Sequence, residues 1–206
     1  MAERHQGAPA PATESHVAGA DWSRRSIDGE QHARGAFVDL DMSETTTRAV
    51  VFEECTFSRA RFNASVHAGT AFLNCTFNGC TFFDARLTEC KLVGSTFDRC
   101  TFDIMRVAGG DWSFVRLAGA DLRRASFHGV RMREADLTGA RCQGAVLRDV
   151  DLSGSWLHAA KLTKCDLRGS DVSAIVPADV ELRGAIVTYE QALIIAMALG
   201  LDVRAE

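Results

Sequence analysis

A five-residue period runs through this chain from about residue 20 to residue 188, and it constrains the fold more than any other feature. The segments 75–79, 120–124 and 165–169 are three copies of one unit, with a large apolar residue at the centre. Every centre from Phe37 to Val187 has a number ending in 2 or 7, and ten of the 12 phenylalanines lie at centres. Neither a helical period of 3.6 nor a strand period of 2 fits this pattern.

A second signal lies two positions before each centre, where the residue is small: mostly Cys, Ala, Ser, Thr or Val. Two inward side chains in each repeat unit predict a coil with four short sides, one unit to a side. Stacked coils would pair at the ordinary strand spacing, so residues 37–187 predict roughly 7.5 coils and a rod about 36 Å long. We therefore expect an all-β chain that forms a quadrilateral parallel β-helix. Its open ends need a cap or a partner.

The seven cysteines fit this scheme as packing residues. Six lie at the small inward position and Cys142 is a centre, so we interpret them as small buried apolar side chains. Cys55 and Cys75 are one full coil apart, as are Cys80 and Cys100, so each pair would stack within reach of a disulfide. No CxxC or HxH pair is present, and no metal site is expected.

The ends of the chain differ from the repeat. Residues 1–19 are rich in Ala, Pro, Gly and polar residues, which indicates a disordered leader without the apolar segment of a secretory signal. Trp22 and Ile27 are in phase with the repeat, whereas His32 weakens an extension upstream of Phe37. No apolar run is long enough for a membrane span, and we expect a cytoplasmic protein.

The repeat ends after Val187, and residues 189–206 are expected to form a capping helix and tail. Thr188 and Gln191 have the spacing of a capping box, and Gly200 is a helix-stop residue. This helix is apolar nearly all round, so one side can cover the solenoid while the other needs a partner. We predict a two-fold homodimer through this end, the alternative being a monomeric cap. The expected dimer residues are Leu193, Ile194, Met197 and Leu201.

No catalytic motif is present, and we expect neither an enzyme nor a cofactor. His67 lies at a centre and is interpreted as a packed or hydrogen-bonded core residue. Asp111, Asp151 and Asp171 share one outward column, but Lys91 precedes it and Arg131 interrupts it, which favours a ladder of surface ion pairs. Net charge is -4, and residues 40–189 hold 18 acids and 18 bases. Charge therefore gives no bulk signal for nucleic acid or membrane binding.

The residues also carry a family resemblance. The run 65–77 with His67 at a centre, the runs 120–123, 150–154 and 165–169, and the tail 184–201 resemble the mycobacterial fluoroquinolone-resistance group of pentapeptide-repeat proteins. These proteins belong with the Qnr-like DNA mimics. The resemblance covers about residues 35–203 in one frame without gaps. Pro177 occupies a centre near the end, where we expect it to bend the last coils.

The resemblance implies a right-handed quadrilateral β-helix that dimerises through its C-terminal end. It also implies a DNA mimic that binds DNA gyrase in competition with DNA, inhibits or modulates it, and protects it from fluoroquinolones, without binding nucleic acid itself. Carboxylates would supply the charge that phosphates normally offer. The alternative is a structural or interaction scaffold with a different protein partner. The expected partner-binding acids are Asp111, Asp121, Glu134, Asp136, Asp149, Asp151, Asp166 and Asp171.

Overall fold

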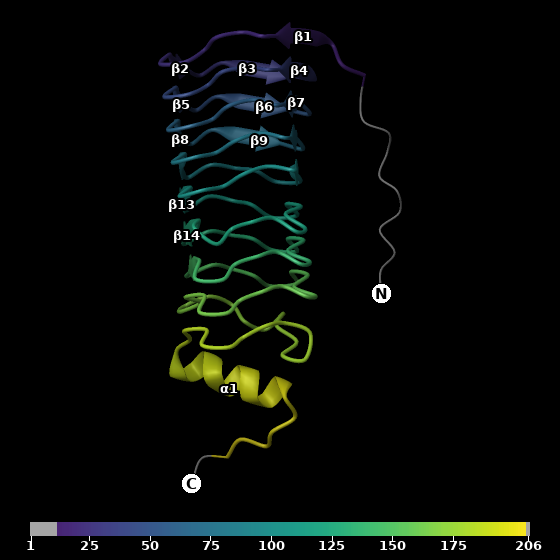
Figure 1. Cartoon of the computed structure of the whole chain (residues 1–206), viewed down its shortest axis with the longest axis vertical. Helices are drawn as coiled ribbons and strands as arrows, with labels where there is room; N and C mark the ends of the chain where they lie inside the picture. The colour runs from purple at the N-terminus through teal and green to yellow at the C-terminus, as the bar shows by residue number, and fades with distance from the viewer. Residues whose placement is uncertain (1–11, 205–206) are drawn as a thin grey trace.

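The computed structural model describes residues 12–204, which form a rod of stacked coils (Figure 1). Strand partners are parallel and lie at equivalent positions of successive coils, as in the pair Phe57 and Phe77. Helix α1 (Tyr189–Ala198) lies across one end of the rod, and β1 (Ser15–Ala18) lies at the other. The four-sided parallel β-solenoid with a helical cap is therefore confirmed.

The solenoid starts earlier than the repeat pattern indicates. Strand β1 pairs in parallel with β4 (Gly35–Val38), so the first coil includes residues that were assigned to the leader. His32 also occupies a regular centre, where its ring stacks on Phe52 with centroids 4.9 Å apart. The remainder of the predicted leader, residues 1–11, lies outside the described residues.

Three faces of the rod carry strands, and we name each face after its first strand. The β1 face holds β1, β4, β7 (Thr56–Ser58), β10 (Thr76–Asn78) and β12 (Thr96–Asp98). The β2 face holds β2 (Ser26–Asp28), β5 (Thr46–Arg48), β8 (Val66–Ala68), β11 (Arg86–Thr88), β13 (Arg106–Ala108), β14 (Ser126–His128) and β15 (Val146–Arg148). The β3 face holds β3 (Gln31–Ala33), β6 (Val51–Glu53) and β9 (Ala71–Leu73).

The fourth face, here the bridge face, is joined by single parallel bridges such as Asp41 to Arg61 and Asp121 to Arg141. Similar bridges continue the strand-bearing faces toward the C-terminus. In chain order the β1 face is followed by the bridge face, the β2 face and the β3 face. The bridge face and the β3 face therefore lie on opposite sides of the rod.

Each corner of the coil is made by the residue two positions after a centre. Among residues 12–204, eighteen non-glycine residues have a left-handed φ of 48–60°, and all of them lie at such corners. L-residues other than glycine disfavour this conformation, so each such corner is locally destabilising, but it turns the chain by the angle that closes the coil. Within the described coils, Gly110 is the one residue with a positive φ, of 87°, that lies at a small inward position instead of a corner.

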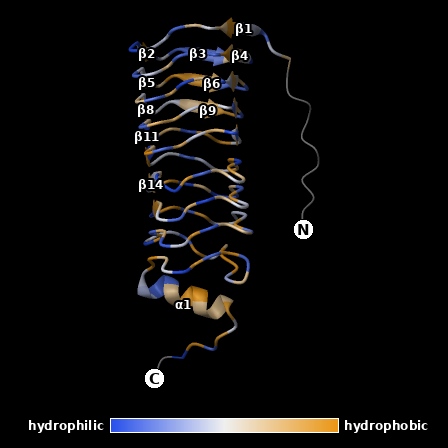
Figure 2. Ribbon diagram, viewed as in Figure 1, coloured by the Kyte–Doolittle hydropathy of each residue, from blue (hydrophilic) through white to orange (hydrophobic). Residues whose placement is uncertain are grey.

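The core consists of stacked centres, and its composition changes along the rod. On the β1 face the rings of Phe37, Phe57, Phe77 and Phe97 stack with successive centroid distances of 4.9, 5.0 and 4.7 Å. The next centre on this face is Leu117, and leucine dominates beyond it. Because each repeat has both inward and outward residues, hydrophobic and hydrophilic segments alternate along the coils (Figure 2). The N-terminal part is thus an aromatic stack and the C-terminal part an aliphatic one.

The small inward residues have a polar role as well as a packing role. Where they carry a donor, most of them donate to the carbonyl of a centre on the preceding coil. Ser95 Oγ lies 2.8 Å from Phe72 O, and Cys75 Sγ lies 3.3 Å from Phe52 O. All seven cysteines are free thiols, and Cys100 is the one that is not fully buried. The packing interpretation is confirmed, and neither stacked pair forms a disulfide.

The two polar centres Thr47 and His67 stack on each other inside the β2 face. Ser65 Oγ donates to Phe62 O at 2.7 Å, so it must accept from His67 Nε2 at 2.9 Å. His67 Nδ1 then accepts from Thr47 Oγ1 at 2.6 Å, and Thr70 Oγ1 donates to Thr47 Oγ1 at 2.7 Å. His67 is thus a neutral, hydrogen-bonded core residue, as the sequence predicts.

Pro177 disturbs the last coil. The corner Gly139 donates its amide to the carbonyl of His158 in the regular way. The next corner in that row, Ala159, donates to Asp179 instead of the equivalent residue Ala178. The ladder has therefore shifted by one residue beside Pro177, which cannot donate a backbone hydrogen bond.

Candidate partner-binding surface

The outward columns are ladders of ion pairs between adjacent coils. Arg59 Nε lies 2.7 Å from Asp39 Oδ1, and Arg131 Nη1 lies 3.1 Å from Asp111 Oδ2. The two residues of each pair occupy equivalent positions on successive coils. Because the strand spacing brings such residues side by side, opposite charges in one column are close enough to form ion pairs. This supports the expectation of a surface ion-pair ladder in the Asp111 column.

The structure distributes the eight predicted partner-binding acids over all four faces. Four lie on the β3 face, namely Asp111, Glu134, Asp151 and Asp171. Asp149 and Asp166 lie on the β2 face, Asp136 on the β1 face and Asp121 on the bridge face. The sequence already places Asp111, Asp151 and Asp171 in one column, whereas the acids on the other faces are near this column only along the chain, since five residues are enough to turn a corner. The β3 face is therefore the one on which several of them meet.

Four of these eight carboxylates, Asp111, Asp121, Asp151 and Asp166, already have an arginine partner. Asp121 lies 2.7 Å from Arg123 and 3.1 Å from Arg141, and the Arg123 hydrogen bond holds its pKa below the usual range. The hydrogen bond from Arg168 likewise lowers the pKa of Asp166 to about 2. Asp136 is only 8% exposed and accepts a hydrogen bond from the amide of Thr138. The pKa values of Asp121 and Asp166 thus keep both carboxylates ionised at neutral pH, but as members of ion pairs.

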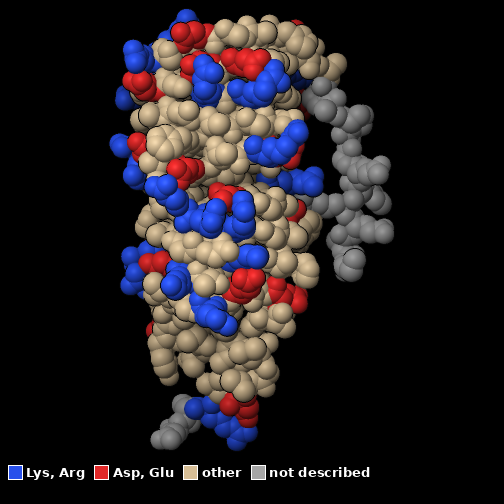
Figure 3. Space-filling model, viewed as in Figure 1, with Lys and Arg blue, Asp and Glu red and all other residues tan. Residues whose placement is uncertain are grey.

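The visible surface has no continuous acidic stripe. Figure 3 shows basic and acidic side chains interspersed along the rod, with few charged groups near the C-terminal end until the tail. On the β3 face the column reads Lys91, Asp111, Arg131, Asp151 along its bridged positions. A partner that approaches this face therefore meets alternating charge, with an acidic excess toward its C-terminal half.

The C-terminal end is fixed by one buried polar side chain. Gln191 forms the predicted capping box with Thr188, and its Nε2 also donates to Leu167 O and Ser170 O, both at 2.7 Å. These carbonyls belong to the last part of the solenoid, so Gln191 attaches the helix to the rod. Gly200 follows the helix with a φ of 85°, as expected for a helix-stop residue.

The outer side of α1 leaves apolar groups in solvent. Met197 is 63% exposed and Leu201 is 60% exposed; Ile194 is also exposed, while Leu193 is half-buried. An apolar groove of about 260 Å³ runs between the helix and the last coil, lined in part by Leu182 and Ile195. The predicted dimer residues therefore lie together on one uncovered apolar end.

The part of the chain that the structure describes contains neither a cluster of metal-ligand side chains nor a membrane-spanning helix. Within residues 12–204, no group of three or more His, Cys, Asp or Glu side chains is placed to hold a metal ion. Over the same residues, no helix has the length and apolar character needed to cross a bilayer.

Sequence reasoning missed a cavity on the bridge face near residues 99–124. A signal was available, since the centres on two adjoining faces change from Phe to Leu there. Phe97 is followed by Leu117 on the β1 face, and Phe102 by Leu122 on the bridge face.

Comparison with known proteins agrees with the repeat. A family model described as pentapeptide repeats (8 copies) matches residues 108–139, 116–154 and 135–173, and the model of the SV2A/B/C luminal domain matches residues 24–102. The pentapeptide repeat protein MfpA of Mycolicibacterium smegmatis is 48% identical over 48 residues, which is 23% of this chain. The match spans a quarter of that relative's length.

Solved structures share the whole architecture. A trypsin-treated variant of QnrB1, a plasmid-mediated fluoroquinolone resistance protein, superposes with a TM-score of 0.60 at 21% identity, covering 95% of this chain and all of that one. Full-length QnrB1 gives a TM-score of 0.51 at 19% identity, covering 91% and 98%. The repeat, the coils and these matches agree on one architecture, a solenoid built from five-residue repeats. The chain is similar to MfpA in sequence over a 48-residue segment and to QnrB1 in fold.

Proposed function

We propose that this protein binds DNA gyrase in place of DNA, inhibits or modulates the enzyme, and protects it from fluoroquinolones. The observation that carries the proposal is the segment 48% identical to MfpA, set in a rod with the fold of a fluoroquinolone resistance protein. The sequence resemblance implies the gyrase partner. In this proposal the protein is cytoplasmic and has no enzymatic activity or cofactor of its own.

The β3 face supplies the chemistry for such a mimic. Glu134 is a corner acid there without an ion-pair partner among residues 12–204, and Asp171 lies further along the same face. Asp111 and Asp151 lie in the column beside them. A groove of Lys and Arg that normally holds DNA phosphates would attract such carboxylates, more strongly at low salt. The other four predicted acids face elsewhere, so the β3 face is the proposed contact.

We place the homodimer at the C-terminal end. The exposed apolar groups of α1 and the groove beside it form a surface that a second copy can fill with the same surface, as two-fold symmetry requires. A dimer of this kind would double the length of the rod. This extension matters for a DNA mimic, because a duplex held by a protein groove is also long and narrow.

The distribution of charge favours a second candidate. Ion pairs within and between coils neutralise many outward carboxylates, and the eight predicted acids lie on four faces. A scaffold that binds another protein partner through its ladder of paired charges would have this surface. The two candidates differ in one respect, since only the mimic must compete with DNA.

A supercoiling assay with purified gyrase tests the proposal. We expect the protein to inhibit supercoiling at micromolar concentration and to reduce the DNA cleavage that a fluoroquinolone induces. Unchanged supercoiling and unchanged drug-induced cleavage, at tenfold higher protein, would reject gyrase as the partner and leave the scaffold.

A further inference from the structure

Near the middle of the rod, two adjacent coils separate on the bridge face. On the bridge face, Phe82 donates to Thr101 and Thr101 donates to Cys80, which joins two coils in the usual way. Among the described residues, the equivalent bonds between 99–104 and 119–124 are missing, including those from the amides of Phe102 and Asp121. The same two coils remain paired on the neighbouring faces, through Thr96 to Arg116 and Arg106 to Ser126. We call this opening the seam.

The seam coincides with the change of core composition. The Phe62, Phe82 and Phe102 rings stack on the bridge face with centroids 4.8 and 5.6 Å apart, so the spacing already widens toward the seam. Leu122 follows Phe102, and a leucine cannot continue a face-to-face ring stack. The coils are therefore least well held together where an aromatic core meets an aliphatic one.

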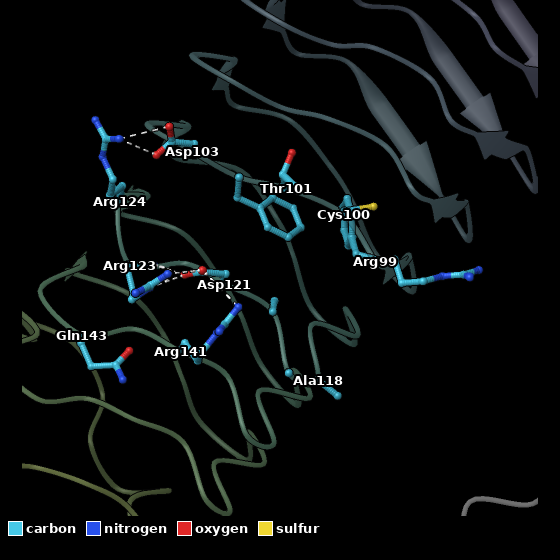
Figure 4. A pocket seen from close by; sticks show the side chains of 14 residues that line it. Arg99, Cys100, Thr101, Asp103, Ala118, Asp121, Arg123, Arg124, Arg141 and Gln143 are labelled. Carbon is cyan, nitrogen blue, oxygen red and sulfur yellow. Dashed lines mark hydrogen bonds and ion pairs between the residues drawn. The ribbon is translucent and has the colours of Figure 1, made fainter.

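The seam opens into a solvent-accessible cavity of about 830 Å³, a size typical of small-molecule sites. Its lining includes four arginines but only two carboxylates. Figure 4 shows Arg123 and Arg141 beside Asp121, and Arg124 beside Asp103. The ion-pair distances are 2.7 and 3.1 Å to Asp121 and 3.1 Å to Asp103. Three guanidinium groups thus share two carboxylates, which leaves one positive charge in excess among them.

We propose that the seam binds a small phosphorylated ligand that also carries hydroxyl or amino donors, such as a nucleotide or a sugar phosphate. Planar guanidinium groups bind phosphate oxygens in pairs, and the amides of Phe102 and Asp121, left without their ladder partners, add donors on both edges. The seam also leaves acceptors unused. Gln143 Oε1 is buried and accepts no hydrogen bond from any described residue, and the Cys100 carbonyl has lost its partner in the ladder.

A ligand in the seam would replace the missing ladder. Phosphates held between Arg123 and Arg124 of one coil and Arg141 of the next, with donors reaching Cys100 O, would join three successive coils. Binding to the folded rod alone raises its stability by mass action. This inference is independent of the proposed partner, since the seam lies on the bridge face and the proposed gyrase contact on the β3 face.

Cys100 provides an assay, because it is among the residues that line the cavity and it is only partly buried, while the other six cysteines are buried and serve as internal controls. The measurement is the rate of iodoacetamide alkylation at Cys100, followed by mass spectrometry on the reduced full-length protein. ADP and inorganic pyrophosphate should slow alkylation in a saturable way, at least tenfold at saturation, and adenosine should not. At one hundred times its dissociation constant, ADP should raise Tm by about 5 °C.

A double variant tests the arginines that are proposed to bind the phosphate. Arg123→Gln with Arg141→Gln should abolish protection by ADP, whereas Arg133→Gln, which removes an exposed arginine paired with Asp151 on the opposite face, should not. Absence of saturable protection in the wild-type protein, protection by adenosine equal to that by ADP, or full protection in the double variant would each overturn the proposal. The first two outcomes need no variant, so they hold even if the double variant fails to fold.

Discussion

Gly110 is the glycine whose replacement by alanine the rod should tolerate least. A Cβ at this position would lie 2.1 Å from the carbonyl oxygen of Cys90 and 2.7 Å from its amide nitrogen, and neither backbone atom can swing away. Overlap and the unfavourable φ together should make Gly110→Ala destabilising by about 3 kcal/mol. Urea denaturation measures this loss.

Gly129 is the matched control. It has a φ of 63°, but a Cβ there would meet no atom within 4 Å. Gly129→Ala should therefore cost about 1 kcal/mol, from the φ alone. Equal losses in the two variants would show that the close approach to Cys90 is not what requires glycine.

His67 should make the rod sensitive to mild acid. Complete burial lowers its pKa to about 4, from 6.5 in the unfolded chain. Between these values the unfolded chain binds a proton that the folded chain does not, so stability falls as pH is lowered from about 6.5 to 4. The difference corresponds to a loss of about 3 kcal/mol, measurable by urea denaturation across this range.

A second variant separates His67 from the carboxylates. The pKa values of Asp41 and Asp166 are lowered to about 2, by hydrogen bonds from Arg61 and Arg168 respectively, so the stability they contribute is lost only at pH below 3.8. His67→Gln should flatten the profile between pH 6.5 and 4, whatever its cost at pH 7. An unchanged slope in that variant would assign the titration to another group.

At the scale of elements, helix α1 depends on Gln191. Gln191→Ala would remove the side-chain donor to Ser170 O and one of the two donors to Leu167 O, and it would remove half of the capping box. The expected cost is about 2 kcal/mol, concentrated at the helix. Hydrogen exchange should show faster exchange of the α1 amides with little change in the coils. Glu190→Gln, an exposed change in the same turn, should leave exchange nearly unchanged.

The elements show how far the sequence predicts this fold. A period of five fixes which side chains face inward, so the coil, the thiol packing and the cap at Thr188 follow from residue types alone. The start at Ser15 does not, because His32 breaks the apolar pattern although its ring stacks as a phenylalanine would. Thr47 and His67 each look like a poor centre, yet their separation by one coil indicates that they are partners.

The candidate surface was less predictable for a geometric reason. Near neighbours in sequence lie on different faces of a four-sided coil, so Asp149 and Asp151 diverge while Asp111 and Asp151 share a column. The position of a residue within its coil assigns the face, but not the ion pairs that neutralise each acid. The seam depends on how the aromatic core packs against the aliphatic core. The sequence of a single repeat carries no information about this packing.

At the scale of the whole molecule, we expect the helical end to decide the oligomeric state. Met197→Lys with Leu201→Lys places two charges on the exposed apolar end, so it should convert a dimer into a monomer with its fold intact. Light scattering at micromolar concentration measures the mass. The matched control is Phe83→Lys, an exposed apolar side chain on the side of the rod, which should remain dimeric. A wild-type monomer under these conditions would contradict the dimer.

The charge of the β3 face should determine how strongly the rod competes with DNA. Glu134→Lys with Asp171→Lys reverses two charges there, and Glu44→Lys makes the same kind of change on the opposite, bridge face. Long-range charge complementarity acts through such groups. We expect the double variant to compete about tenfold less well and the control to match the wild-type protein.

The most direct measurement is displacement of labelled duplex DNA from gyrase, followed by fluorescence anisotropy. If the rod occupies the place of DNA, the wild-type protein releases the duplex completely and competitively, and more weakly as salt is raised. Binding of this protein to gyrase without release of DNA, or no binding at all, would contradict DNA mimicry.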